Sequence, residues 1–257
     1  MMADTRETRA SAREIKFVLD ERLAPAIRAW ARQNLQPDPH GAGVFNDAYT
    51  TSTIYFDTSR LDVFHRRDSY GRAKYRVRRY GRADTVFFER KLRKPGLLIK
   101  RRTVDAIAAL AHLEHDQANP HWAGHWFHRR LLVRRLEPIC QVTYDRIARV
   151  APTAEGLVRL TLDDNLRASA VDAPGFAADP GESFLDGHTV LELKYHARVP
   201  AVFRRLIEEF ALKPQTASKY RLAVSAIGRP ESVAPATHPT ADARPSRCAL
   251  GPASACA

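Results

Sequence analysis

The sequence predicts an α+β protein that is mainly antiparallel β, a closed β-tunnel or barrel of about eight strands with a few covering helices. Short segments in which apolar and charged residues alternate recur along most of the chain, and only a few segments show helical spacing. The charged positions of these segments are almost only Arg, Lys and Glu. The solvated face of an ordinary sheet also carries Ser, Thr, Asn and Gln, so a closed sheet with a charged interior is the better explanation.

The length and composition favour one domain. The chain has 257 residues, of which 44% are hydrophobic, and single all-β barrels often reach this size. We expect a loose N-terminus over residues 1–12, the tunnel domain over residues 13–228 and a disordered tail over residues 229–257. The tail is rich in Pro and Ala and lacks periodic apolar residues.

The cellular compartment is predicted from what the sequence lacks. Its three cysteines, at irregular spacing, do not form a disulfide framework. Neither a secretory leader nor an apolar run of about 18 residues is present. The expectation is a cytoplasmic protein with no membrane span.

The elements are expected in the following order. A strand over residues 13–19 comes first, and Asp20 can cap the helix after it, whose apolar residues Leu23, Ile27 and Trp30 have helical spacing. Further helices are expected at residues 105–115 and at 199–212, where Pro200 lies in the first turn. The other strands are expected over residues 51–57, 73–80, 85–92, 97–104, 139–150, 157–162 and 189–195.

Strand alternation places charged residues together on one face, because residues two apart point the same way. The groups are Glu14 and Lys16; Lys74, Arg76 and Arg78; Glu89 and Lys91; Lys100 and Arg102; Arg159 and Asp163; Glu192 and Lys194. A solvated outer face would explain any single strand, but the repetition over six strands favours an interior. Buried like charges cost several kcal/mol each when unpaired, so the cations imply a polyanionic ligand.

The balance of charge points to phosphate chemistry. The chain has 41 Lys and Arg against 29 Asp and Glu, a net charge of +12 that favours polyanionic partners. Glu14, Glu89 and Glu192 interrupt the cations, and they would repel phosphate unless they hold a divalent cation or pair with neighbours. Mg²⁺ and Mn²⁺ accept carboxylate oxygens and bridge them to phosphates. Metal-assisted phosphoryl transfer is therefore the leading hypothesis.

Several short pieces of sequence, in this order and spacing, resemble a known family. They are Arg13 to Phe17, Tyr55 to Asp57, Lys74 to Tyr80, Phe88 to Lys91, Lys100 to Arg102, Tyr144 to Arg146, Arg159 to Asp163, Leu191 to Lys194 and Ser218 to Tyr220. Together they resemble the VTC (vacuolar transporter chaperone) polyphosphate polymerase domain of the triphosphate tunnel metalloenzyme superfamily, which is related to the CYTH phosphatases.

The resemblance implies a role for individual residues. Glu192 matches the metal-coordinating glutamate of the family, and Glu14 and Glu89 are weaker candidates for metal or water contacts. Lys194 is a further substrate contact or, like Asp163, orients its neighbours. The cations expected to bind and align the phosphates are Lys16, Arg76, Arg78, Lys91, Lys100, Arg146, Arg159 and Lys219.

The resemblance also implies a reaction. Eukaryotic members transfer the terminal phosphate of ATP to a growing polyphosphate chain with Mn²⁺ or a similar divalent ion and release ADP. This sequence shows neither their inositol-phosphate-sensing SPX domain nor their transmembrane region, so we expect a stand-alone tunnel like that of bacterial members. Whether another protein couples it to a membrane stays open. The alternatives are a tripolyphosphate or nucleoside triphosphate hydrolase of the same superfamily and a non-catalytic polyphosphate-binding protein.

Other features of the sequence carry less weight. Glutamates within the basic stripe argue against nucleic-acid binding, although Tyr75 and Tyr80 could stack on bases. The histidines His121, His125 and His128 lack accompanying carboxylates or cysteines and are expected to pack or lie at the surface. The run Asp163 to Asn165 is expected to form a turn after a strand, and Asp57 to form a turn rather than act as an acid.

Overall fold

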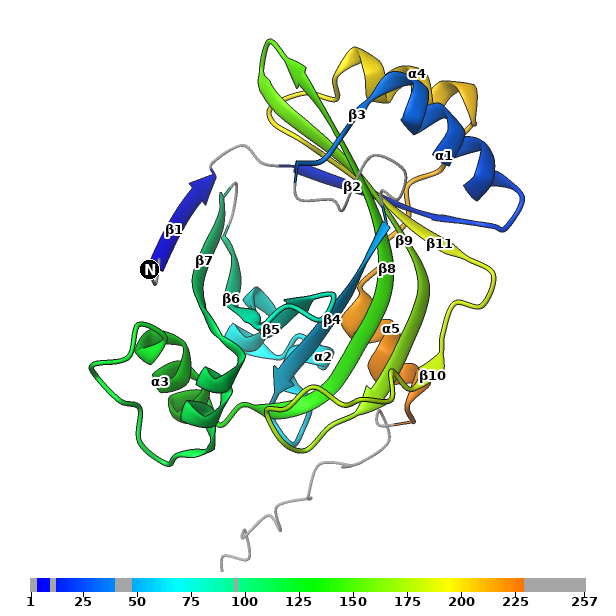
Figure 1. The fold of residues 1–257 in the computed structure, drawn as a ribbon. Helices are drawn as coiled ribbons and strands as arrows, with labels where there is room; N and C mark the ends of the chain where they lie inside the picture. Colours follow the sequence, from blue (N-terminus) through cyan, green and yellow to red (C-terminus); the bar gives the residue numbers. More distant parts are fainter. Residues whose placement is uncertain (1–3, 10–12, 40–47, 95–96, 229–257) are drawn as a thin grey trace, which may run out of the picture.

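The computed structural model describes residues 4–9, 13–39, 48–94 and 97–228 (Figure 1). Its main feature is one strongly curved antiparallel sheet of eleven strands, with the order β1-β7-β6-β5-β4-β8-β9-β11-β2. Two short strands lie off this path, since β10 pairs with β9 and β3 with β8. The elements are β1 (Asp4–Arg9), β2 (Arg13–Leu19), α1 (Leu23–Asn34), β3 (Gln36–Pro37), β4 (Ala48–Asp57), α2 (Asp62–His65), η1 (Asp68–Arg72), β5 (Ala73–Tyr80), β6 (Thr85–Lys94), β7 (Leu97–Ala106), η2 (Ile107–Glu114), α3 (His125–Arg134), β8 (Glu137–Thr153), β9 (Gly156–Ala170), β10 (Glu182–Ser183), β11 (Thr189–Tyr195), α4 (Ala201–Glu209) and α5 (Lys219–Ala226).

The eight strands predicted from alternation are all present, as β2, β4 to β9 and β11. The predicted turn at Asp163 to Asn165 is wrong, because β9 continues through these residues and runs to Ala170. Two local irregularities of the backbone accommodate these polar residues within β9. Asn165 takes a left-handed conformation with φ of 49°, and the β8–β9 register shifts between Thr143 and Asp145.

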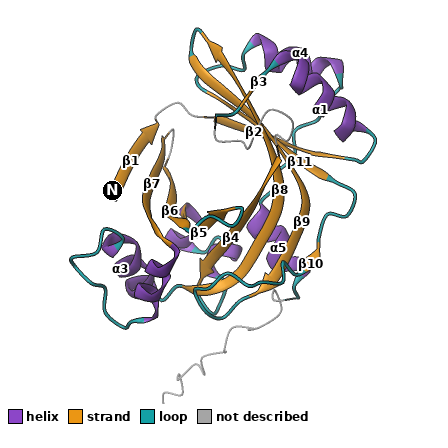
Figure 2. Cartoon of the chain, in the orientation of Figure 1, coloured by secondary structure: helices purple, strands orange, loops and turns teal. Residues whose placement is uncertain are grey.

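The outer face of β2, β11 and β9 is covered by α1 and α4 (Figure 2). The predicted helix is present as α1, and its N-cap is Arg22 rather than Asp20. The Oδ1 atom of Asp20 accepts backbone bonds from Arg22 and Leu23 at 3.0 and 2.8 Å in the turn that leads into the helix. Trp30 Nε1 donates to Glu209 Oε2 at 2.9 Å and joins the two helices. The predicted helix near residues 199–212 is confirmed as α4, with Pro200 at its N-cap.

A second lobe, formed by η2 and α3, covers the outer face around β5 and β6. Phe127 of α3 is fully buried and makes edge contacts with Phe56, Tyr75 and Phe88, with ring centroids 5.6 to 5.9 Å apart. The helix predicted near residues 105–115 is a 3₁₀ helix, η2. Apolar side chains therefore face outward onto helices, which leaves the charged side of each strand on the inside of the curve.

We call this inner side the concave face. It carries Glu14 and Lys16 (β2), Tyr49, Thr53 and Tyr55 (β4), Lys74, Arg76, Arg78 and Tyr80 (β5), Phe87, Glu89 and Lys91 (β6), Lys100 and Arg102 (β7), Tyr144 and Arg146 (β8), Arg159, Thr161 and Asp163 (β9), and Glu192 and Lys194 (β11). The curvature brings distant strands together, since Lys91 of β6 lies 3.4 Å from Glu14 of β2.

The helix α5 lies inside the curve of the sheet rather than outside it. Its first residue, Lys219, contacts concave-face carboxylates, and the next, Tyr220, lies 5.2 Å from the Tyr55 ring between centroids. The Tyr220 hydroxyl donates to Asp57, which also accepts backbone bonds from Val63 and Phe64 at 2.7 and 2.8 Å. Asp57 is thus a buried structural residue that joins β4, α2 and α5, as its predicted role in a turn implied.

The sheet curls into a tunnel-like shape without the predicted complete closure. Among the described strands, β1 and β2 form the two ends of the pairing order, and no ladder joins them. One reason is that the edge of β2 is used otherwise, since the Lys16 carbonyl accepts a bond from the Gln215 amide at 2.8 Å. The N-terminal segment expected to be loose contains β1, which pairs along β7. The proposed tail lies outside the described residues.

No helix within the described ranges has both the length and the apolar character needed to cross a membrane.

Candidate functional site

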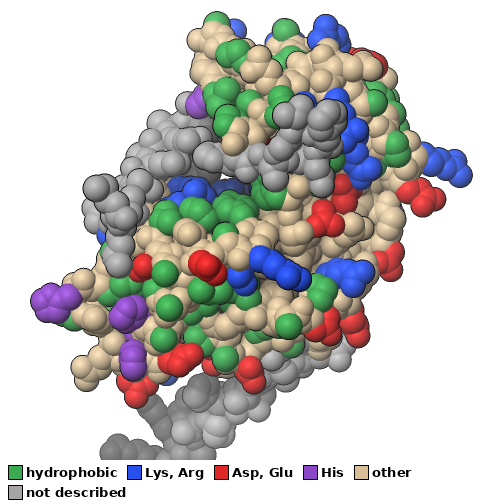
Figure 3. Space-filling model, viewed as in Figure 1, with side chains coloured by type: hydrophobic (Ala, Val, Ile, Leu, Met, Phe, Trp, Pro, Cys, Tyr) green, Lys and Arg blue, Asp and Glu red, His purple; other side chains and the backbone are tan. Residues whose placement is uncertain are grey.

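The cations of the concave face form rows across neighbouring strands. The register of β5, β6 and β7 places Lys74, Lys91 and Lys100 opposite one another, and Arg76, Glu89 and Arg102 in the next row. The space-filling view shows Lys and Arg side chains inside the hollow of the molecule (Figure 3). Strand alternation predicted this clustering, and the structure adds Lys74 and Arg102 to the cations that the resemblance implied.

Glu89 organises the second row. It is 1% exposed, and its carboxylate accepts from Arg76 Nε and Arg102 Nε, both at 2.7 Å, with Lys100 at 3.3 Å. Burial alone would raise the pKa of Glu89, but Arg76, Arg78, Lys100 and Arg102 hold it well below its usual value. Because its oxygens already accept from three cations, Glu89 is placed to orient the arginines.

A pair of carboxylates lies across the concave face from these rows, on β2 and β11. We call the two sides of the concave face its walls, one formed by β5 to β7 and the opposite one by β2 and β11. Lys16 Nζ bridges them, at 2.9 Å from Glu14 Oε1 and 2.8 Å from Glu192 Oε1. Lys219 Nζ approaches the same Glu192 oxygen at 3.0 Å, and Lys194 lies 3.4 Å from Oε2. Burial opposes ionisation here too, and Glu14 and Glu192 repel each other. The surrounding lysines nevertheless lower the pKa of Glu14 to about 2 and that of Glu192 well below its usual value.

A buried ion triad connects this wall to α5. Arg146 makes a bidentate pair with Asp163, at 2.6 and 2.7 Å, and Lys219 Nζ lies 2.6 Å from Asp163 Oδ2. Asp163 is fully buried, and although burial favours its neutral form, Arg146 and Lys219 lower its pKa. The predicted orienting role of Asp163 is consistent with this position, where it fixes two predicted phosphate ligands.

The remaining predicted cations lie toward Tyr49 and Tyr80. Arg78 Nε donates to Thr53 Oγ1 at 3.2 Å, and burial of Tyr80 is outweighed by this arginine, so that the pKa of Tyr80 falls to about 8. Arg159 lies 2.8 Å from Asp38 and 3.1 Å from the Tyr49 hydroxyl. Sequence alternation gave no reason to select Tyr49 or Asp38, since the first is uncharged and the second lies outside the predicted strands.

The predicted metal ligands differ in how well they fit a cation. Glu14 and Glu192 converge on a single Lys16 ammonium, so the same two carboxylates can share one divalent ion. Glu89 lies on the opposite wall among arginines. Within the described residues no group of three or more His, Cys, Asp or Glu side chains is arranged to hold a metal. The fit is therefore that of a carboxylate pair that needs substrate phosphates to complete the coordination, which is the usual arrangement for Mg²⁺.

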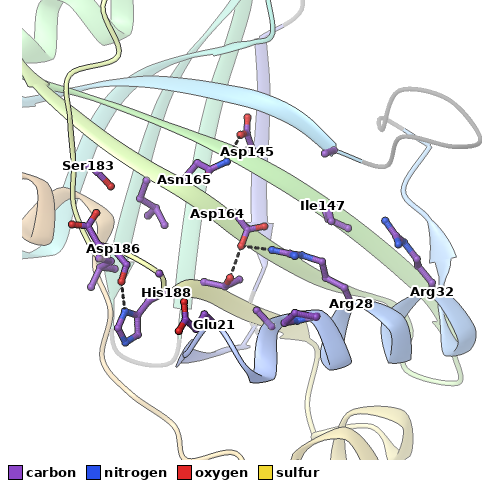
Figure 4. A pocket seen from close by; sticks show the side chains of 17 residues that line it. Glu21, Arg28, Arg32, Asp145, Ile147, Asp164, Asn165, Ser183, Asp186 and His188 are labelled. Atoms are coloured by element: carbon purple, nitrogen blue, oxygen red, sulfur yellow. Dashed lines mark hydrogen bonds and ion pairs between the residues drawn. The ribbon is translucent and has the colours of Figure 1, made fainter.

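The histidine His128 and a cavity beside α1 lie away from the concave face. His128 is buried in the α3 lobe beside Trp122, which agrees with a packing role. A cavity of about 660 Å³ lies between α1 and the outer face of β8 and β9 (Figure 4). It contains the ion pair of Arg28 with Asp164 at 2.7 Å, and Asp164 also accepts from Thr189, so the contact fastens α1 to the sheet.

Comparisons with known proteins agree with this fold. A family model described as the VTC domain matches residues 11–227, and no curated protein matches the sequence. A putative adenylate cyclase from Bacillus halodurans has a similar fold, with a TM-score of 0.51, 14% identity, and coverage of 82% of this chain and 95% of that chain.

A second similar structure is a putative adenylyl cyclase from Hippeastrum that is described as having a dominant triphosphatase activity. Its TM-score is 0.51 at 15% identity, and the match covers 84% of this chain and 96% of that chain. At this identity the likeness concerns the fold. The match of the family model over most of the chain shows that the chain belongs to the VTC domain family.

Proposed function

We propose that this protein transfers the terminal phosphate of ATP to a growing inorganic polyphosphate chain on the concave face, with Mn²⁺ or Mg²⁺ as cofactor. The observation that carries the proposal is that cations line one wall of the concave face and a carboxylate pair lies on the opposite wall. The cation rows of β5 to β7 face the carboxylate pair of β2 and β11, and the contact of Lys91 with Glu14 at 3.4 Å joins them. One wall suits phosphate oxygens, and the other suits a divalent cation.

The side chains of the concave face can position phosphates without forming a covalent intermediate. Arg76 and Arg102 are held in fixed orientations by Glu89, so they can bind phosphate oxygens with little loss of side-chain freedom. Arg146 and Lys219 are held in the same way by Asp163. Transfer between phosphates needs mainly alignment and charge neutralisation, which these four cations supply.

The carboxylate pair supports the metal-dependent part of the proposal. Glu14 and Glu192 are kept ionised by the surrounding lysines, which is the state that binds a divalent cation. A bound cation would neutralise phosphate oxygens during transfer. Lys16 contacts both carboxylates, so it is placed to exchange this contact for one with a substrate phosphate.

Hydrolysis of a triphosphate is the second candidate. It is favoured by the similar fold of the Hippeastrum protein, whose described activity is a triphosphatase. The same cations and carboxylates would serve both reactions, and only the acceptor, water or phosphate, would differ.

One experiment separates the candidates. The full chain is incubated with ATP and Mn²⁺, and the products are resolved on a gel with a polyphosphate stain while ADP and free phosphate are assayed. Long polyphosphate with ADP supports the polymerase, and free phosphate without polymer supports the hydrolase. If neither forms, while calorimetry detects tripolyphosphate binding, the protein is a binding protein and the proposed activity is wrong. The double variant R76A/R78A is the negative control.

A further inference from the structure

Three lysines stand side by side on the concave face. Lys74 lies opposite Lys91, and Lys91 lies opposite Lys100, in the register of β5, β6 and β7. Like charges directly opposite one another destabilise a sheet. Two of the three have a carboxylate within reach, since Lys91 lies 3.4 Å from Glu14 and Lys100 lies 3.3 Å from Glu89.

Lys74 is different. Its ammonium donates to the Ser218 hydroxyl at 2.8 Å, and within the described ranges no carboxylate forms an ion pair with it. Ser218 is the N-cap of α5, where its Oγ also accepts from the Arg221 amide at 3.4 Å. The hydroxyl contact therefore fixes the position of the lysine without neutralising its charge.

The charged groups with the largest effect on Lys74 are cationic. They are Lys16 of β2, Lys91 of β6, Arg76 of β5 and Arg66 after α2. Burial and these four cations lower the pKa of Lys74 to about 7. A group in this position is missing an anion, and the neighbouring cations are those that the proposed function assigns to phosphate.

We propose that Lys74 is a direct ligand of a substrate phosphate beside the N-terminus of α5, and that binding of a polyphosphate or triphosphate takes up one proton at this lysine. The inference rests on the proposed binding of phosphate to the concave face. The neutral amine of the ligand-free protein takes a proton from the buffer, and the resulting ammonium donates to a phosphate oxygen. The proton stays on Lys74 while the anion is bound.

The size of the effect depends on pH. With a pKa of about 7, about nine tenths of Lys74 is neutral at pH 8 and about one tenth at pH 6. An adjacent phosphate raises this pKa, so at pH 8 binding adds about 0.9 proton per chain. At pH 6 the amine is already protonated, and binding adds about 0.1 proton.

Calorimetry can count these protons. Tripolyphosphate is titrated into the full chain at pH 8 and at pH 6, each in two buffers that differ in ionisation enthalpy, and the slope of binding enthalpy against ionisation enthalpy gives the proton number. Wild type is compared with K74M, K74R and the control K213M, which removes an exposed lysine of the segment between α4 and α5. Protonation of tripolyphosphate itself is common to all variants and cancels in the differences.

The expected result is about 0.9 proton more for wild type and K213M than for K74M at pH 8, and almost no difference at pH 6. K74R should bind about as tightly as wild type without the extra proton, because arginine keeps its charge. Equal proton numbers in wild type and K74M at pH 8, with binding intact, would overturn the role of Lys74 and leave the proposed function standing. Absence of tripolyphosphate binding to wild type would overturn both.

Discussion

Replacement of Asp163 by Asn tests how the concave face is held together. Asp163 is fully buried and neutralises both Arg146, at 2.6 and 2.7 Å, and Lys219, at 2.6 Å. Asn keeps the shape but removes the charge, which leaves Arg146 buried beside an amide. Removal of one member of a buried ion pair costs about 3–5 kcal/mol. Because Glu192 still lies 3.0 Å from Lys219, we expect the lower end, about 3 kcal/mol.

This cost is measurable as a change in melting temperature. For a chain of this size each kcal/mol corresponds to about 2–4 °C, so D163N should melt about 6–12 °C below wild type in circular dichroism. The variant also carries one negative charge fewer on the concave face. Saturating tripolyphosphate should therefore raise its melting temperature by more than it raises that of wild type.

D164N is the matched control. Asp164 is the next residue, but it points outward and pairs with the partly exposed Arg28 at 2.7 Å, and such a pair contributes at most about 1 kcal/mol. Its melting temperature should therefore fall by no more than about 4 °C. The reasoning would be refuted if D163N melted within about 2 °C of wild type, or if D164N lost more stability than D163N.

Three further predictions concern binding, catalysis and pH. R76A/R78A should lose at least tenfold in tripolyphosphate affinity in calorimetry, whereas R79A, on the opposite face of β5, should not. E192Q should keep tripolyphosphate binding but lose turnover that depends on Mn²⁺. The folded-state pKa of Glu14 is about 2 against an ordinary 4.5, so its stabilisation is complete above pH 4.5 and is lost toward pH 2. Acid unfolding of E14Q should accordingly show a weaker pH dependence in that interval.

Each of these has an outcome that contradicts it. Unchanged affinity of R76A/R78A would remove both arginines from the binding site, and equal losses in R79A would indicate a general charge effect. Full activity of E192Q would exclude Glu192 as a metal ligand. A pH dependence of E14Q identical to that of wild type would show that Glu14 is not kept ionised by Lys16 and Lys91.

Much of the strand arrangement could be predicted, because the alternation of charged and apolar residues shows which side chains face the concave interior and which face the outer layer. Arg76 is inward and Val77 outward, and in the structure Val77 is fully buried against the outer layer while Arg76 contacts Glu89. The pairing of Glu89 with arginines could not be predicted, because register depends on turns between strands. For the same reason the sequence placed Glu89 with the metal candidates, although it lies on the wall opposite Glu192.

The helices were predicted less well. The segment of α5, from Lys219 onward, has no clear apolar stripe. The reason is that the helix lies within the curve of the sheet and contacts both charged and apolar groups. Its Ser218 cap was visible in the sequence but was interpreted only as part of a family motif. α3 was also missed, and β1 was missed because its residues, from Asp4 to Arg9, are all polar.

The row of Lys74, Lys91 and Lys100 has a consequence for the engineering of this fold. Lys91 and Lys100 each lie beside a carboxylate, but the described contact of Lys74 is with a hydroxyl. A neutral residue at Lys74 should therefore relieve the repulsion within the row and raise the melting temperature of the ligand-free protein, while weakening its affinity for phosphate chains. A screen for heat resistance alone would then select against substrate binding. Screening in the presence of tripolyphosphate reverses the direction of selection, because the bound anion neutralises these lysines and its binding stabilises the folded protein.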